Sequence, residues 1–250
     1  MVGVLPTLSP RVLIGNYQPF RLYLESALKR PVEMVTAKNF DTFHQNTMAG
    51  TYDVVITAAH LGRLAQVEGR FMPLATYQSQ NRAVLLTSKA APLKSVAQLK
   101  GGTVATLDRA ALIVSQTLLW LEDKELRLGK DFKLLETSSH NSAAYSVLSG
   151  ESALAIVAPA GLKQMPSDIQ EGLQIFAALP PIPALMWLAH PRISSEVPRL
   201  TTVLLGFSSQ LPEGKQFFDT TGYQNMREIT EAEMKSLDPH LPYLKQQLGQ

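Results

Sequence analysis

The sequence predicts an α/β protein made of two lobes, each a mainly parallel β-sheet flanked by helices. Three observations support this. Strand and helix signals alternate from the N-terminus, a second alternation begins near Arg82, and one pattern recurs a hundred residues apart. MAGTYDVVITAA and LSGESALAIVAP place Gly50 and Gly150 between a helix-like run and a buried apolar strand. We expect such a repeat where two lobes share one build.

The first lobe opens with a short apolar strand and a long helix. Ser9 and Pro10 fit an N-cap and a first helical position, where proline costs no hydrogen bond. Pro19 is expected to kink or restart this helix, because an internal proline removes a backbone donor. The patterns predict strands at Val2–Leu5, Val32–Thr36 and Tyr52–Thr57, and helices at Pro10–Leu28, Asn39–Ala49 and His60–Val67. This alternation is typical of parallel sheets covered on both faces.

The second lobe repeats the alternation. Ser95 caps a single short helical turn, and Gly101 and Gly102 turn the chain into a strand that ends at Thr106. The other predicted elements are strands at Ala83–Thr87, Phe132–Glu136 and Ala153–Val157, and helices at Asp108–Leu121 and Asn141–Leu148.

The last quarter of the chain begins with a stretch that contains three prolines, AALPPIPALMWLA. These prolines predict a crossover between lobes rather than a membrane helix, which needs about 20 uninterrupted apolar residues. The remaining predicted elements are a strand at Leu185–Ala189 and helices at Val197–Gln210, Pro212–Phe218 and Glu231–Leu248.

Composition excludes several classes of protein. The 250 residues are 45% hydrophobic and 18% charged, which suits a folded core rather than a disordered chain. A net charge of +2 without a basic run argues against nucleic-acid binding. The absence of cysteine excludes disulfides, thiol catalysis and cysteine-ligated zinc. The N-terminus MVGVLP enters a strand without a leader, so either the protein is cytosolic or a signal peptide has been removed.

The chemistry of a site is expected at the strand-to-helix loops. Ligands of open parallel sheets bind beyond the carboxyl ends of the strands, here in LPTLSP, ITAAHL, ATLDRA and ETSSHN. No nucleophile elbow, HExxH, P-loop or GxGxxG motif is present, and the five histidines show no metal-ligand spacing. The sequence therefore predicts no enzyme, no cofactor and no metal.

Four phrases in order over residues 2 to 190 resemble one family, the type 2 solute-binding proteins of ABC transporters, and within it the phosphate, phosphite and phosphonate branch. The phrases are GVLPTLSP followed by YQPF, YDVVITAAHL, SVAQLKGGTVAT, and SSHNSAAYSVLSGESALAIV. The resemblance implies a type II periplasmic-binding-protein fold. Residues 1–79 and 184–250 would form lobe 1 and residues 80–183 lobe 2, with hinges near Gln78–Arg82 and Pro180–Pro183.

The resemblance also implies a function. The protein would bind a small phosphonate-like or phosphate-like oxyanion in a cleft between the lobes, close around it by hinge motion, and deliver it to the membrane subunits of an ABC permease. It would be periplasmic or extracytoplasmic. A sensor domain of a signalling protein and a cytosolic enzyme of the same fold are the alternatives, the enzyme resting on His60 and His140 as an acid-base pair across the cleft.

Candidate ligand contacts come from the loops. Helix N-termini and hydroxyls suit an oxyanion, histidine can donate to it, and arginine can offer a bidentate fork. His140 matches the loop histidine of the family. The predicted ligand-binding residues are Thr7, Ser9, Thr57, His60, Tyr77, Thr106, Arg109, His140 and Asn141. Plain alternatives stand beside them: Ser9 as a simple N-cap, Arg109 in an ion pair with Asp108, and Tyr77 in packing.

Two departures from the family pattern bear on the ligand. Where relatives have a Ser/Thr-rich turn, this chain has TLDRAAL, and Asp108 would repel a dianion. Relatives also carry an acidic residue shortly before the tryptophan of the returning strand, whereas this chain has IPALMW, ending at Trp187. The departures leave a different small anion or a more apolar ligand open as alternatives to a phosphonate.

Overall fold

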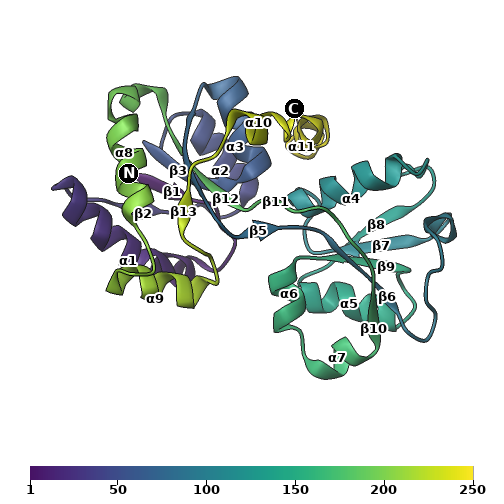
Figure 1. Ribbon diagram of the computed structural model, residues 1–250. Coiled ribbons are helices and arrows are strands. Elements are labelled where there is room, and N and C mark those ends of the chain that lie inside the picture. Colours follow the sequence, from purple (N-terminus) through teal and green to yellow (C-terminus); the bar gives the residue numbers. More distant parts are fainter. Residues whose placement is uncertain (250) are drawn as a thin grey trace. The chain divides into compact units, whose positions relative to one another are not determined.

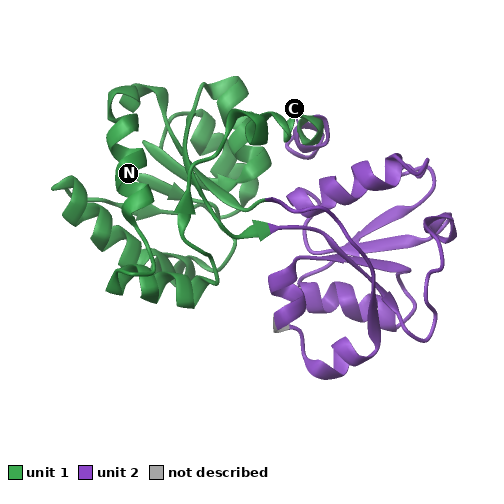
Figure 2. Ribbon diagram, in the orientation of Figure 1, with its two compact units in different colours: residues 1–80, 183–241 green, residues 81–182, 242–250 purple. Residues whose placement is uncertain are grey.

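The computed structural model describes residues 1–249, apart from the side chain of Gln164, and its chain divides into two compact units (Figure 2). Unit 1 comprises Met1–Gln80 and Pro183–Leu241, and unit 2 comprises Asn81–Ile182 together with the chain from Pro242 onward. In the described part of the chain, no helix is long and apolar enough to cross a membrane.

Unit 1 is built on a six-stranded sheet in the order β13-β4-β12-β3-β1-β2 (Figure 1). Strands β1, β2 and β3 are parallel neighbours, whereas β12 and β13 run antiparallel to the strands beside them. The strands are β1 (Val2–Val4), β2 (Met34–Val35), β3 (Val54–Ala58), β4 (Met72–Tyr77), β12 (Leu185–Ala189) and β13 (Met226–Arg227).

Helices cover both faces of this sheet. The first face packs against α1 (Pro10–Leu28), α8 (Val197–Gly206) and α9 (Pro212–Thr221) in a core rich in aromatic rings, where Phe20 stacks on Phe207 with centroids 3.8 Å apart. Next to β3 and β12 lies α3 (Ala59–Gly69), with α2 (Phe40–Met48) packed against it. The remaining elements of unit 1 are η2 (Pro191–Glu196), α10 (Glu231–Lys235) and η3 (Asp238–His240).

The packing of α9 gives a first testable prediction. A Cβ at Gly214 would lie 1.9 Å from the Ser208 carbonyl oxygen, so Gly214→Ala must displace backbone. We expect a loss of about 1–3 kcal/mol of unfolding free energy, the typical range for overpacked cores. In α1 a Cβ at Gly15 meets nothing within 4 Å, so Gly15→Ala is the matched control and should stabilise by about 0.5–1 kcal/mol. Urea unfolding of both variants measures the change in unfolding free energy. Equal changes in the two variants would contradict the close packing of Gly214 against Ser208.

Unit 2 is built on a five-stranded sheet in the order β10-β6-β9-β7-β8. Its strands are β6 (Val84–Ser88), β7 (Thr103–Thr106), β8 (Lys133–Glu136), β9 (Leu154–Val157) and β10 (Leu173–Ala178). One face packs on α4 (Leu112–Glu122) and the other on α5 (His140–Leu148), and η1 (Val96–Leu99), α6 (Pro159–Gln164) and α7 (Ser167–Glu171) complete the unit.

The two units repeat one topology. In each, a central strand has parallel neighbours on both sides, and one of those neighbours is followed in the sheet by an antiparallel strand. The repeated phrase corresponds to α2 with β3 and to α5 with β9. Asn39 and Ser139 cap the two helices through their side chains. Gly50 (φ 72°) and Gly150 (φ 81°) then turn the chain in the left-handed region, which suits glycine. The repeat predicted from sequence is therefore structural.

The predicted two-lobed α/β fold is confirmed, and both of its sheets are mixed: the interior strand β12 runs antiparallel to β3 and β4 in unit 1, and the interior strand β6 runs antiparallel to β9 and β10 in unit 2. Several details of the helices are corrected by the structure. Pro19 lies inside α1 without ending or restarting it. Asp108 does not open a helix, since α4 begins only at Leu112. The predicted C-terminal helix is divided into α10, η3 and α11 (Leu241–Gln247), with Pro239 and Pro242 at the breaks.

Three segments join the two units, and the first two lie within the predicted hinge ranges Gln78–Arg82 and Pro180–Pro183. The crossings fall at Gln80 and Asn81 in β5 (Gln80–Asn81) and at Ile182 and Pro183 in β11 (Ile182–Pro183), and these two strands pair with each other. A third change of unit occurs after Leu241, although the sequence placed residues 184–250 in one lobe. The reason is packing, because Tyr243 lies against the α4 core of unit 2.

Candidate functional site

The predicted ligand loops lie at the carboxyl ends of parallel strands in both units. We call residues 6–9 and 57–60 of unit 1 rim 1, and residues 106–109 and 137–141 of unit 2 rim 2. Each rim is described within its own unit.

Rim 1 is assembled by the pairing of β1 with β3. Val4 lies opposite Ile56, and the Leu5 amide donates to the Ile56 carbonyl at 2.9 Å, so the loops that follow the two strands begin side by side. Thr7 and Ser9 are exposed in the first loop, whose turn is closed by a 2.8 Å bond from the Thr7 amide to the Leu5 carbonyl. The sheet therefore brings both predicted loops of unit 1 together.

Helices at rim 1 begin without side-chain caps. Ser9 is the N-cap of α1, but its hydroxyl makes no capping bond, and α3 follows Ala58, which has no side chain able to cap. The first amides of a helix have no intrahelical acceptor and carry partial positive charge. Rim 1 thus offers two helix ends of the kind that binds oxyanions.

Buried polar groups lie next to these helix ends. Thr57 is 2% exposed, and its Oγ1 makes no hydrogen bond within the described residues. His60 is buried in the first turn of α3. A buried hydroxyl without a hydrogen-bond partner lowers the stability of the folded state. The buried hydroxyl of Thr57 therefore destabilises the unliganded protein.

Rim 2 has the same construction. Thr106, the last residue of β7, is fully buried, and its Oγ1 has no partner among the residues described. Its carbonyl accepts bonds from the amide and hydroxyl of Thr137 at 2.8 and 3.0 Å, which ties the β7 and β8 loops together. Asp108 accepts from the Ala110 amide at 2.7 Å in a tight turn, and α4 then starts after Ala111 without a side-chain cap.

His140 opens α5 at rim 2. Its Nδ1 is buried and bonds to no atom of the described chain, and burial lowers the pKa of the imidazole. His140 is therefore a neutral donor or acceptor at pH 7 rather than a cation. Gly161 in α6 leaves room for the ring, because a Cβ there would lie 2.2 Å from the imidazole Cδ2.

Histidine burial predicts an acid-sensitive fold. Burial lowers the pKa of His44, His140 and His240 in the folded protein. As the pH falls, these histidines are therefore protonated in the unfolded chain at a higher pH than in the folded protein. Stability should be unaffected by these groups above the ordinary pKa near 6.5 and should fall as the pH drops below it. Each group contributes a slope of at most about 1.4 kcal/mol per pH unit. Urea unfolding between pH 7.5 and 5 measures this, and His44→Gln should flatten the slope. A stability that rises on acidification would contradict it.

Two predicted residues are engaged by other parts of their own units. Tyr77 is fully buried in the core of unit 1, where its hydroxyl contacts Tyr17 at 3.3 Å and accepts from the Trp187 indole at 3.2 Å, so its role is packing. Arg109 donates to Glu136 at 3.1 Å and to the Leu134 carbonyl at 3.2 Å, not to Asp108, which corrects the expected ion pair.

Asn141 is separated from His140 by the turn of the helix. It is exposed and lines an open depression of about 560 Å³ along α5, together with Ser138, Ser142 and Tyr145. His140 does not line this depression. The two neighbours in sequence therefore serve different surfaces of unit 2.

Two contributors were not predicted. Gly161 was missed because the contact between α6 and the His140 ring is tertiary, and no local turn requires glycine there. Ser142, which contacts the hydroxyls of Ser138 and Ser139 at 3.1 and 2.9 Å, could have been found as the third residue after an N-cap serine. Among residues 1–249, no three His, Asp or Glu side chains gather in a way that could hold a metal ion.

The chain is similar to known proteins in sequence and in fold. Residues 2–234 match the family model described as ABC transporter, phosphonate, periplasmic substrate-binding protein. Among solved structures, XAC2383 from Xanthomonas citri bound to chloride has a TM-score of 0.85 at 15% identity, over 99% of this chain and 97% of that one. PhnD1 from Prochlorococcus marinus in complex with methylphosphonate gives 0.78 at 15% identity, with the same coverage. The aliphatic sulphonate binding protein SsuA from Escherichia coli gives 0.69 at 14% identity, over 100% and 93%.

Proposed function

Because the chain belongs to the phosphonate-binding family of periplasmic substrate-binding proteins of ABC transporters, we propose that it binds a small phosphonate-like or phosphate-like oxyanion between its two units. The family consists of binding proteins rather than enzymes, which leaves no role for His60 and His140 as a catalytic pair. The chain has the type II periplasmic-binding-protein fold, which it shares with PhnD1 and SsuA.

The observation that carries this proposal is the same on both rims. A buried threonine hydroxyl with no partner among the described residues, Thr57 in rim 1 and Thr106 in rim 2, is followed along the chain by a helix that starts without a side-chain cap. Hydroxyls and free amides are the groups that bind phosphorus and sulfur oxyanions. We place the ligand oxygens against these groups, with neutral His140 as a further donor. Thr7 and Ser9 contribute from the exposed loop of rim 1.

The rims also support an organic substituent on the anion. Leu8 in rim 1 is 50% exposed and Leu107 in rim 2 is 36% exposed. Arg109, the one predicted cation, is bound to Glu136. Neutral donors with apolar neighbours suit a monoanion that carries an alkyl group better than inorganic phosphate, whose second charge Asp108 would repel.

Binding would be coupled to hinge closure. The paired crossings β5 and β11 are the short segments whose backbone angles would change, and the third crossing after Leu241 would follow them. The liganded, closed protein would then be recognised by the membrane subunits of an ABC permease, outside the cytoplasm.

A thermal-shift screen tests the ligand class. Phosphate, phosphite, methylphosphonate, longer alkylphosphonates, alkanesulfonates and carboxylates are compared at equal ionic strength. A true ligand at a hundred times its Kd adds about 2.7 kcal/mol to stability. We expect the largest shift from an alkylphosphonate or alkanesulfonate. No shift with any phosphorus or sulfur oxyanion would refute the proposal while leaving the fold intact.

A further inference from the structure

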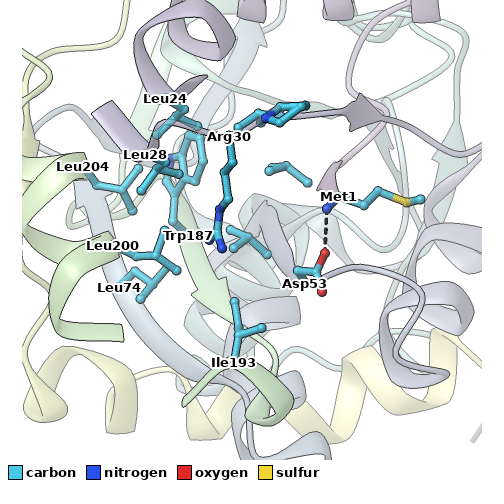
Figure 3. Close-up of a pocket in the computed structure, with 14 residues that line it drawn as sticks. Met1, Leu24, Leu28, Arg30, Asp53, Leu74, Trp187, Ile193, Leu200 and Leu204 are labelled. Carbon is cyan, nitrogen blue, oxygen red and sulfur yellow. Dashed lines mark hydrogen bonds and ion pairs between the residues drawn. The ribbon is translucent and has the colours of Figure 1, made fainter. Parts of the chain in front are cut away.

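Unit 1 contains a pocket at the end of its sheet opposite to rim 1. It is lined by the amino-terminal ends of β1 and β3, at Val2 and Val54, whereas rim 1 follows the carboxyl ends of the same strands. The pocket has a volume of about 260 Å³ and lies between the sheet and the helices α1 and α8 (Figure 3). No part of the proposed oxyanion site lines it.

The walls of this pocket, which we call the α1–α8 pocket, are apolar. Leu24 and Leu28 come from α1, Leu200 and Leu204 from α8, and Trp187 from β12. All five are at most 6% exposed. An apolar cavity of about 150 Å³ is already large enough to bind benzene. The α1–α8 pocket can therefore hold a larger apolar body, such as a short alkyl chain or an aromatic ring.

One charged side chain reaches into the pocket. Figure 3 shows Arg30 extending from the end of α1 into the space that Trp187 and Leu200 line. The Arg30 side chain is half exposed, and its one ion pair with the described residues is long, 3.7 Å to Glu196. Glu196 lies at 3.8 Å from Arg199 as well, so two arginines face one carboxylate and positive charge is in excess.

The other two charged groups that line the pocket, the Met1 amino group and the Asp53 carboxylate, form an ion pair with each other. Burial raises the pKa of Asp53, but hydrogen bonds from the Met1 amino group and Arg192 outweigh this and keep the pKa below its usual value. These bonds measure 2.6 and 2.9 Å, and Figure 3 marks the first of them. Asp53 is thus a paired carboxylate that does not compete for Arg30.

From this arrangement we propose that the α1–α8 pocket is a second ligand site, specific for a small amphiphilic monoanion such as a short fatty acid. The apolar body lies against the leucines and Trp187, and the carboxylate takes both N–H groups of the Arg30 fork. The site belongs to unit 1 alone and does not depend on the proposed oxyanion site.

Octanoate is the probe, with octanol as the same chain without charge and acetate as the charge without the chain. Trp120→Phe removes the only other tryptophan, so fluorescence then reports on Trp187. We expect octanoate to shift this fluorescence saturably, with acetate at least a hundredfold weaker. Saturating methylphosphonate should not displace octanoate, which separates this site from the rims.

Variants identify the contacts. Arg30→Gln should weaken octanoate at least tenfold and leave octanol unchanged, whereas Val32→Phe, which fills the pocket from its side, should abolish binding of both. Arg199→Gln is the matched control, since it faces the same Glu196 but does not line the pocket. Absence of a saturable octanoate signal, equal loss from both arginine variants, or full binding by a folded Val32→Phe protein would each overturn the proposal.

Discussion

Thr57→Val and Thr106→Val are expected to make the unliganded protein more stable and the ligand bind more weakly. Each replaces a buried hydroxyl that bonds to nothing in the described chain by a methyl group of the same shape. Removing an unpaired buried hydroxyl should add about 1 kcal/mol to the unfolding free energy. If the same hydroxyl bonds a charged ligand, its loss costs about 1.5–3 kcal/mol of binding, which is tenfold or more in Kd.

Opposite signs for stability and affinity distinguish a binding residue from a structural one. Thr76→Val is the matched control, because Thr76 is equally buried, on β4 of the same sheet as Thr57, but donates to the Leu185 carbonyl at 2.9 Å. That variant should lose about 1 kcal/mol of stability and keep its affinity. Urea unfolding and calorimetric titration with the best ligand of the screen give both quantities. Unchanged affinity in Thr57→Val and Thr106→Val would remove both hydroxyls from the site.

His140→Ala and Gly161→Ala are expected to weaken ligand binding by similar factors, about tenfold or more. The first removes a neutral donor next to the rim 2 loops. The second removes nothing that could touch a ligand, but its Cβ would lie 2.2 Å from the ring Cδ2 and 2.6 Å from Cγ of His140. Because Cγ is close to the backbone, the ring cannot rotate away in place and must move from its position.

A double-mutant cycle separates this indirect effect from a general one. If Gly161 acts only by holding the ring of His140, then Gly161→Ala should cost no affinity in the His140→Ala background. Titration of the four proteins with one ligand measures the coupling, and their melting temperatures confirm that each is folded. Additive losses would show that Gly161→Ala disturbs rim 2 by another route, and unchanged affinity in His140→Ala would exclude the histidine.

The local elements of the fold were predictable because their causes are local. The period of apolar residues, the Ser9–Pro10 helix start and the Ser95 cap each depend on neighbours in sequence, and the corresponding elements are present. The repeat at Gly50 and Gly150 was visible because both helices need the same left-handed turn before the next strand. Strands β4, β10 and β13 were missed, since their patterns are not distinctive without the partner strands beside them.

The candidate site was only partly predictable for the same reason. The sequence shows that Thr57 and Thr106 lie at the ends of strands and that His140 follows one, and the parallel register then brings neighbouring loops together in each unit. Whether a side chain is available depends on partners that are distant in sequence. Arg109 is taken by Glu136 and Tyr77 by Tyr17 and Trp187, and neither contact has a local signature.

The sequence by itself determined the two α/β units and the end of each sheet at which a ligand is expected, because these follow from periodicity, caps and strand order, and its four family-like phrases indicated the family. Only the tertiary structure decided which polar groups at those ends lack partners, that the chain after Leu241 returns to unit 2, and that a pocket with Arg30 lies at the opposite end of the unit 1 sheet. Hydrogen-bond satisfaction and cavity shape are sums over contacts between distant segments, so no single stretch of sequence contains them.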